Sequence, residues 1–173
     1  MDKIYIDKLS KWHNKLDIIK SLFKDDSLNI ELIYISKFEN TKDLRDFVDS
    51  VCLFLKLSDK LRSRIVLISD ELNNNAIEYW SSSETYNYLR ISTNVIDWVI
   101  NFNLEVEDNW KWKSPKKALD METMRAHKLK LWYFWHDSIR WRGLFLIIVK
   151  LVNRLYFKNS KDGWLIVWIK MKI

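Results

Sequence analysis

The sequence predicts a globular domain of the α+β class, because stretches with helical periodicity and stretches with strand periodicity succeed one another along the chain. At 173 residues the chain is long enough to form one hydrophobic core. Hydrophobic residues make up 48% of the chain and charged residues 30%, which is typical of a folded protein and not of a disordered one. The sequence shows no internal repeat and no low-complexity linker.

The first third of the chain is expected to contain two helices and one strand. Apolar residues at helical spacing predict that residues 1–27 are helical. Residues 29–36 are apolar and β-branched, which is typical of a strand. Asn40 or Thr41 is a suitable cap for the next helix. The inner face of that helix is expected to carry Leu44, Phe47, Val48, Val51, Phe54 and Leu55.

A further helix and two strands are expected in the middle of the chain. A helix over residues 59–79 follows a serine cap. Residues 86–93 and 99–107 alternate between apolar and polar side chains, as paired strands do. The pair Asp97-Trp98 lies in the connection between these strands, where Asp-Gly would form a much better hairpin turn.

The last third of the chain is expected to hold a long loop, a helix and a strand. Residues 109–142 are irregular, polar and basic, and a loop of that length in a compact domain is usually functional. An apolar helix is expected to begin at Gly143 and to end near Tyr156. A polar turn then leads into a last strand over residues 165–172.

The charge, the cysteine count and the hydropathy pattern restrict the classes of function. The net charge is +6 and the isoelectric point is near 9.3, but the basic residues are scattered, so we expect no direct binding of nucleic acid. The single cysteine, Cys52, excludes an internal disulfide and fits a reducing, cytoplasmic location. The longest apolar run, residues 144–149, is too short to span a bilayer, and we expect no contact with a membrane.

Tryptophan and glycine occur in unusual numbers. The chain has ten tryptophans and two glycines, whereas glycine makes up about 7% of an average chain. Trp110, Trp112, Trp141 and Trp164 stand where turns or phosphate-binding loops would carry glycine. We hypothesise that the gene uses UGA for glycine and that the codon was translated here as tryptophan. UGG codons at Trp110, Trp112 and Trp141 would contradict this hypothesis.

Residues 71–80, with the sequence ELNNNAIEYW, resemble the N box of the GHKL (histidine-kinase-like) ATPase family. In that family the element commonly reads E-x-x-x-N-A-x-x-H-G, so Tyr79 replaces a histidine and Trp80 replaces a glycine. The resemblance covers residues 29–173. It implies a two-layer α/β sandwich, in which a mixed and mostly antiparallel sheet carries helices on one face and an ATP lid covers the nucleotide.

Glu71 and Asn75 are four residues apart, so in a helix they share one face. A carboxylate beside an amide suits a Mg²⁺–triphosphate site, because Mg²⁺ prefers oxygen ligands and the nucleophile needs a base. By the resemblance, Asn75 holds the magnesium ion and Glu71 positions or deprotonates the attacking hydroxyl or water. ATP and Mg²⁺ are therefore the expected cofactors. A solvated polar face is the ordinary interpretation of an isolated E-x-x-x-N pattern.

Asp108, at the end of a predicted strand, resembles the family's adenine-reading aspartate. Such a carboxylate accepts a hydrogen bond from the exocyclic amine of adenine and so discriminates against guanine. Taken alone, Asp108 and Asn109 would suit an ordinary turn equally well. Glycines in place of Trp110 and Trp112 would let the backbone pass close to the base and the ribose.

The segment Trp141-Arg142-Gly143-Leu144 resembles the family's second glycine box. By that resemblance, backbone N–H groups at the start of the following helix hold the phosphates of ATP, and Arg142 adds positive charge. With tryptophan literally present at positions 110, 112 and 141, we expect ATP to bind poorly.

The order of elements is most similar to that of anti-sigma-factor serine/threonine kinases, with residues 1–27 as a helical extension and residues 28–173 as the ATP-binding domain. This resemblance implies a dimer that binds Mg-ATP, holds a sigma factor and phosphorylates a serine of an antagonist protein. One alternative is a reduced histidine-kinase catalytic unit with His13 as the acceptor. Another is a non-enzymatic binding protein that uses the nucleotide as a switch.

Overall fold

The computed structural model describes residues 1–6, 14–80, 84–109, 117–123, 154–161 and 165–173. In chain order its elements are β1 (Asp2–Tyr5), α2 (Lys15–Leu22), β2 (Ser27–Ile35), the 3-10 helix η1 (Phe38–Asn40), α3 (Thr41–Phe54), α4 (Asp59–Asn75), the π-helix η2 (Ala76–Trp80), β3 (Tyr86–Ile96), β4 (Val99–Glu107), β5 (Arg154–Asn159) and β6 (Leu165–Lys172).

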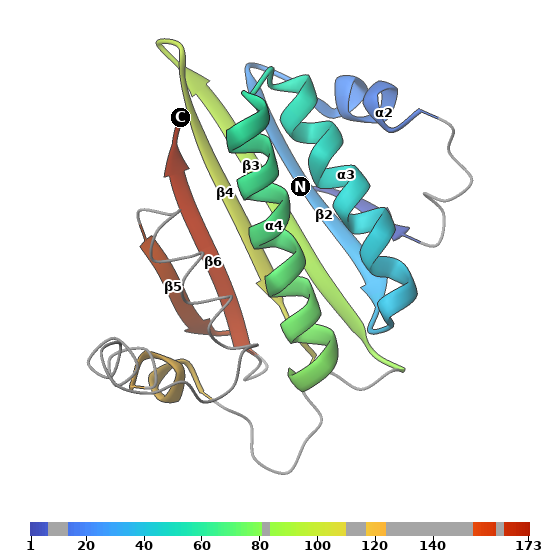
Figure 1. Ribbon diagram of the computed structural model, residues 1–173, viewed down its shortest axis with the longest axis vertical. Coiled ribbons are helices and arrows are strands. Elements are labelled where there is room, and N and C mark those ends of the chain that lie inside the picture. Colours follow the sequence, from blue (N-terminus) through green and yellow to red (C-terminus); the bar gives the residue numbers. More distant parts are fainter. Residues whose placement is uncertain (7–13, 81–83, 110–116, 124–153, 162–164) are drawn as a thin grey trace.

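The strands form one six-stranded sheet in the order β1-β2-β3-β4-β6-β5 (Figure 1). β1 and β2 run parallel, and every other neighbouring pair in this sheet is antiparallel. The predicted α+β fold with a mixed, mostly antiparallel sheet is therefore confirmed. The resemblance to GHKL ATPases goes further than this, and its ATP lid falls mainly on residues outside the described ranges.

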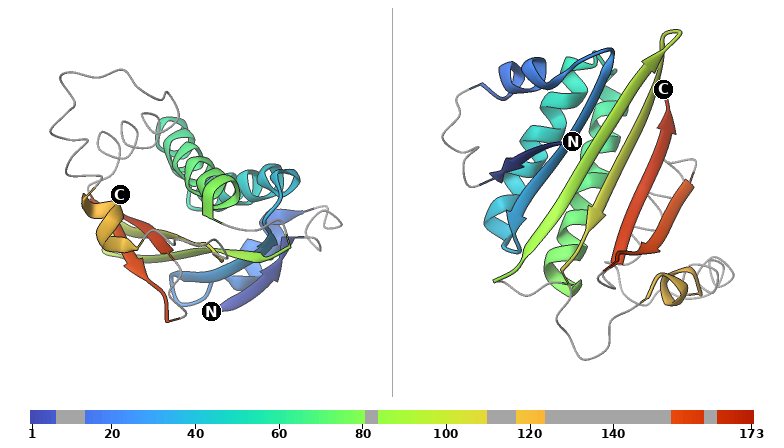
Figure 2. Two further views of the ribbon diagram at one scale, coloured as in Figure 1. Left: turned by 90° about the horizontal axis from the view of Figure 1, so that it is seen from below. Right: turned by 180° about the vertical axis from the view of Figure 1, so that it is seen from behind.

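The two long helices, α3 and α4, pack against each other over one face of the sheet (Figure 2). Alternate strand residues point to that face, since successive side chains of a strand point to opposite sides. Leu32 of β2 and Leu89 of β3 are register partners, both fully buried in the core cluster. The core therefore lies between the helix pair and one face of the sheet, as a two-layer arrangement requires.

Most elements agree with the sequence pattern. The predicted strands at 29–36, 86–93, 99–107 and 165–172 correspond to β2, β3, β4 and β6. Of the six residues expected on the inner face of α3, four are buried and two are partly buried against the same core. These elements were predictable because each buries one regular stripe of apolar side chains.

Two helical predictions were wrong at an edge of the sheet. Residues 2–5, expected to be helical, form β1, whose Ile4 pairs with Leu32 of β2. The helix expected to reach Tyr156 cannot do so, because β5 begins at Arg154 and pairs with β6. In both segments pairing with another strand overrides the local helical preference. The helical expectation for residues 1–27 holds for α2.

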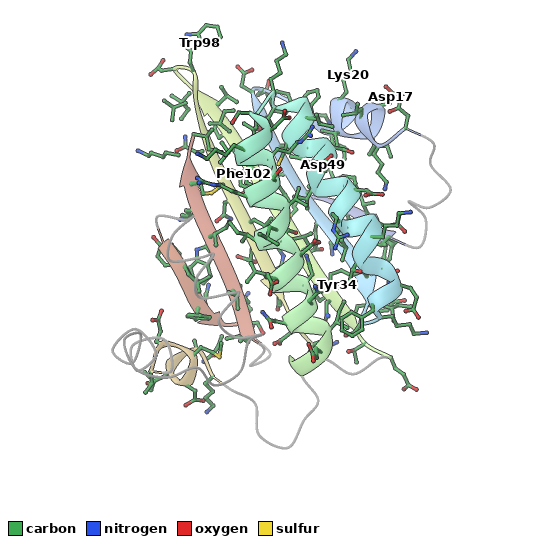
Figure 3. The ribbon with its side chains drawn as sticks, in the orientation of Figure 1. Asp17, Lys20, Tyr34, Asp49, Trp98 and Phe102 are labelled. Carbon is green, nitrogen blue, oxygen red and sulfur yellow. The ribbon has the colours of Figure 1, made fainter. Side chains whose placement is uncertain are left out.

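The turn between β3 and β4 has the geometry that favours glycine. Ile96 and Val99 are register partners, so a two-residue loop joins the strands, and its residues Asp97 and Trp98 have φ values of 48° and 67°. Positive φ at both positions is the type I′ turn, for which Asp-Gly is among the best sequences. Trp98 is 97% exposed and points away from the protein at the tip of the hairpin (Figure 3). A bulky residue at this φ is an outlier.

The sheet face opposite the helices carries a cluster of ion pairs centred on Arg90. Its guanidinium contacts the carboxylates of Glu31, Glu105 and Glu107, which lie on the two neighbouring strands. Lys3 of β1 lies 3.7 Å from the carboxylate of Glu31. The side chains of Glu31 and Glu107 are only 5% and 9% exposed, so Glu107 depends on Arg90 for its charge balance, and Glu31 depends on Arg90 and Lys3.

Candidate functional site

Glu71 and Asn75 lie in the last turns of α4. The buried stripe of this helix is formed by Ile65, Ile68, Ser69, Leu72 and Asn73. Glu71 and Asn75 are outside that stripe and only partly buried, so the structure places both predicted residues along one accessible side of the helix. The side-chain nitrogen of Asn75, Nδ2, is nevertheless buried and has no hydrogen-bond partner among the described residues.

The carboxyl group of Glu71 lies in an environment that favours proton uptake. Burial raises its pKa above the ordinary value, and the neighbouring carboxylate of Asp70 raises it further. Asp70 itself pairs with Arg45 of α3, with 2.5 Å between Asp70 Oδ2 and Arg45 Nε. A carboxylate with a raised pKa is a stronger base than an exposed one, which is the property that a general base requires.

The helix changes its geometry directly after Asn75. We predicted a continuous helix over residues 59–79, but α4 ends at Asn75 and residues 76–80 form the π-helix η2. Ala76 and Ile77 remain in the core, whereas Glu78 is exposed. π-Helical turns occur frequently at functional sites. Here the π turn rotates residues 76–80 about the helix axis relative to a continuous α-helix.

Asp108 follows β4 and is completely buried. Its Oδ1 accepts a hydrogen bond from the N–H of Leu165 at 3.0 Å, and its own N–H donates to the carbonyl of Leu165 at 3.2 Å. Its Oδ2 is buried without a hydrogen-bond partner among the described residues. Burial raises the pKa of Asp108 to about 7, the hydrogen bond from Leu165 lowers it, and the charge of Glu107 raises it.

The C-terminal ends of α4 and β4 lie at the same end of the molecule (Figure 1). The structure therefore brings Glu71 and Asn75 to the end of the fold at which Asp108 lies, although these residues come from different layers. The hydroxyl of Tyr34 of β2 donates to Asn73 of α4 at 2.7 Å, which links the sheet to this helix. Burial raises the pKa of Tyr34, a hydrogen bond with Asn87 lowers it, and the charge of Asp108 raises it.

Sequence reasoning missed the buried polar network to which Tyr34 belongs. Asn73 Nδ2 donates to the carbonyl of Ser69 at 2.8 Å and to its Oγ at 3.1 Å, so Asn73 uses both ends of its amide inside the core. Asn87 of β3 donates to Oγ of Ser36 at 3.3 Å. The available signal was the spacing of Ser69 and Asn73, two polar residues four apart on the apolar stripe of α4.

The remaining predicted site residues lie outside the described residues. These are Trp110, Trp112, Trp141, Arg142, Gly143 and Leu144. The two glycine boxes therefore stay predictions, and so does the phosphate contact assigned to Arg142.

Magnesium is compatible with the residues that the structure describes. Among these residues, no group of three or more His, Cys, Asp or Glu side chains could hold a metal ion by itself. A magnesium ion that arrives with a nucleotide needs few protein ligands, because phosphate oxygens and waters supply the others. The buried, unpartnered Nδ2 of Asn75 also fits such a group, because it would donate to a phosphate oxygen while Oδ1 faced the ion.

A separate cavity of about 380 Å³ lies at the end of β5 and β6, on the sheet side that carries Glu107. Its lining is formed by Glu107, Lys158, Asn159, Ser160, Lys161 and Ile166. None of the predicted site residues contributes to it. We base the candidate site on Glu71, Asn75 and Asp108. Asn75 and Asp108 each have a buried atom without a partner among the described residues, and the pKa values of Glu71 and Asp108 are raised.

Comparisons with known proteins support the fold. No protein-family model matches the chain, and no curated protein matches it. A chain in the crystal structure of the SiaB-SiaC complex from Pseudomonas aeruginosa is similar, with a TM-score of 0.53 and 10% identity. The match covers 94% of this chain and 99% of that chain, and at this identity it shows a shared fold alone. In the described part of the chain, no helix has the length and apolar character needed to cross a membrane.

Proposed function

We propose that this protein is a Mg-ATP-binding regulator of the anti-sigma-factor type, which transfers phosphate to a serine or threonine of an antagonist protein. The observation that carries the proposal is the carboxylate of Asp108, which is fully buried and has one oxygen without a partner in the described part of the chain. A buried orphan acceptor is costly unless a ligand satisfies it. The exocyclic amine of adenine is a donor of the right kind, whereas guanine presents a carbonyl oxygen at that position.

Glu71 and Asn75 supply the chemistry of the proposed transfer. Bound Mg²⁺ would neutralise charge on the phosphates of ATP. Asn75 would contact the ion through Oδ1 and a phosphate oxygen through the buried Nδ2. Glu71, whose pKa is raised, would accept the proton of the attacking hydroxyl. The γ-phosphoryl group would pass to that oxygen as its bond to the β–γ bridging oxygen breaks, and ADP would leave.

We extend the proposal to protein partners, because the similar solved chain was crystallised in a complex. The similar solved chain belongs to a complex that contains SiaB and SiaC. By the sequence resemblance, the corresponding partners of this chain are a sigma factor and an antagonist protein. A non-enzymatic, nucleotide-switched binding protein is the second candidate, because the same site would hold ATP without transferring phosphate. The histidine acceptor of the third candidate, His13, lies outside the described residues.

The test is a calorimetric titration of Mg-ATP into two proteins. One is the chain as written, and the other, the glycine variant, carries glycine in place of Trp110, Trp112 and Trp141. We expect saturable, Mg²⁺-dependent binding by the glycine variant and at least tenfold weaker binding by the chain as written. Asp108→Asn in the glycine variant should reduce the preference for ATP over GTP. The absence of binding by both proteins would refute the proposal.

A second measurement separates the kinase from the switch. The glycine variant is incubated with γ-labelled ATP and with a cell extract from which ATP has been removed. Transfer of label to a protein serine or threonine, lost in Glu71→Gln, supports the kinase. Nucleotide binding without transfer supports the switch.

A further inference from the structure

We propose that Tyr34 is a positioning residue for the magnesium side of the nucleotide site, and that it acts through Asn73. This inference rests on the proposed function, because it concerns the same site. Tyr34 lies beneath the C-terminal half of α4 (Figure 3). It is 1% exposed, as is Asn73, and neither residue can reach solvent. Their effect on a nucleotide must therefore pass through the position of α4.

The hydrogen bonds of Asn73 fix the rotation of the last turn of α4 about the helix axis. Its Oδ1 accepts from the hydroxyl of Tyr34 at 2.7 Å, which ties the helix to β2. Its Nδ2 donates to Ser69 one turn earlier, at 2.8 Å to the carbonyl and 3.1 Å to Oγ. Both ends of the amide are thus fixed, and the side chain has one orientation in which its polar atoms are satisfied.

The inward orientation of Asn73 determines the direction in which Glu71 and Asn75 point. Residues two positions apart in an α-helix lie about 200° apart around its axis. Glu71 and Asn75 lie two positions before and two positions after Asn73, so both point away from the core, about 40° from each other. With Asn73 anchored inward, this pair is held on one accessible side of the helix, where both residues are only partly buried.

Asn73 lies close to the point at which the α-helix changes to a π-helix. α4 ends at Asn75, and the π-helical segment begins at Ala76. The N–H of Ala76 still bonds to the carbonyl of Leu72, but a π turn has a different hydrogen-bond register, so the regular α-helical ladder does not extend through residues 76–80. The bond between Tyr34 and Asn73 is therefore the polar contact with the sheet that lies nearest to this junction among those described.

The adenine side of the site has a separate anchor. Asp108 is held by two hydrogen bonds with the backbone of Leu165, and neither bond involves α4. Loss of the Tyr34 hydroxyl should therefore disturb the magnesium side and leave adenine recognition in place. This division distinguishes a positioning role from a general loss of stability, which would weaken both functions together.

The test compares Tyr34→Phe with its parent, the glycine variant. For each protein, the Kd of ATP is measured with Mg²⁺ and with EDTA, and the ratio of the two values gives the magnesium enhancement. We expect Tyr34→Phe to lower this enhancement roughly tenfold, the equivalent of one buried hydrogen bond. The Kd in EDTA and the ratio of ATP to GTP affinity should change less than about twofold. Tyr88→Phe, a hydroxyl loss on the other sheet face, should change neither ratio.

A double variant separates positioning from stability. Tyr34→Phe leaves the buried Oδ1 of Asn73 without its donor and should lower the melting temperature. Tyr34→Phe with Asn73→Leu removes both partners of this hydrogen bond and should restore part of it, because Oδ1 of Asn73 is no longer left without a donor. We expect the magnesium enhancement to stay low in the double variant. Recovery of the enhancement together with the melting temperature would overturn the inference, and so would full enhancement in Tyr34→Phe.

The failure of this inference is distinguishable from the failure of the proposed function. If the glycine variant binds no Mg-ATP, both the function and the role of Tyr34 are refuted. If it binds Mg-ATP and Tyr34→Phe behaves like its parent, the role of Tyr34 alone is refuted.

Discussion

Asp108 and Leu165 are joined by two reciprocal hydrogen bonds where β4 ends and β6 begins. The N–H of Leu165 donates to Oδ1 of Asp108 at 3.0 Å, and the N–H of Asp108 donates to the carbonyl of Leu165 at 3.2 Å. These bonds fix the carboxyl plane, and Oδ2 is buried with no hydrogen-bond partner among the residues that the structure describes. The arrangement positions one acceptor for a ligand, and the buried acid is less costly in the free protein when it is protonated.

The first prediction concerns the effect of pH on stability. Burial raises the pKa of Asp108 to about 7 in the folded state, whereas an unfolded aspartate has a pKa of about 3.9. The folded state therefore binds this proton more tightly, and its contribution to the free energy of unfolding is present below about pH 4 and is lost as pH rises to about 7. A difference of about three units corresponds to roughly 4 kcal/mol at most. Urea unfolding between pH 5 and 8 measures it.

Asp108→Asn is the matched control for this pH dependence. The amide keeps the acceptor for Leu165 but does not titrate, so the decline in stability between pH 5 and 7 should be smaller in this variant. An identical decline in both proteins would show that other groups cause it. The affinity for ATP should increase as pH rises, because the carboxylate of Asp108 must be ionised to accept a hydrogen bond from adenine without donating one.

The second prediction concerns the tryptophans. Trp98 is almost fully exposed at φ 67°, so Trp98→Gly removes strain without loss of burial and should raise the free energy of unfolding by about 1 kcal/mol. Trp168 of β6 stacks on Tyr156 with 5.0 Å between ring centroids. Trp168→Gly should therefore lower the free energy of unfolding by about 2 kcal/mol. Denaturant titration of both variants tests the difference, and a loss of stability in Trp98→Gly would count against glycine as the natural residue there.

The third prediction concerns the ion cluster around Arg90. Arg90→Met leaves the nearly buried carboxylate of Glu107 without its counter-charge and leaves Glu31 only the exposed Lys3, so it should lower the free energy of unfolding by about 3–5 kcal/mol at pH 7. Arg62→Met is the control, because Arg62 has a similar exposure but its partners Asp49 and Asp59 are 38% and 92% exposed. That change should cost less than about 1 kcal/mol. Equal effects in thermal unfolding would contradict this interpretation.

The fourth prediction separates binding from phosphate transfer. In the glycine variant, Glu71→Gln should lower the rate of transfer by roughly 10²- to 10⁴-fold, because the amide cannot accept the proton of the nucleophile. Its Kd for Mg-ATP should remain within about twofold of the parent. Glu39→Gln, at an exposed position in η1, should leave both quantities unchanged. Equal rates in Glu71→Gln and its parent would exclude Glu71 as the base.

The candidate site was only partly predictable from the sequence. The spacing of Glu71 and Asn75 on one helix was sufficient to place them together, because helical periodicity is local. The burial of Asp108 was not predictable, since it depends on Leu165, which is far along the chain. The role of Tyr34 was not predictable for the same reason, because the sequence around a tyrosine in an apolar strand does not indicate that it will contact Asn73.

The sequence by itself determined those elements whose side-chain pattern is regular, among them α3, β3, β4 and β6, and the two-residue turn at Asp97-Trp98. These depend on neighbours within one or two turns of chain. Only the tertiary structure decided that residues 2–5 and 154–159 are strands, since their free energy comes from pairing with β2 and β6. It also decided which polar side chains are buried, because burial and its compensating hydrogen bonds arise when distant segments meet.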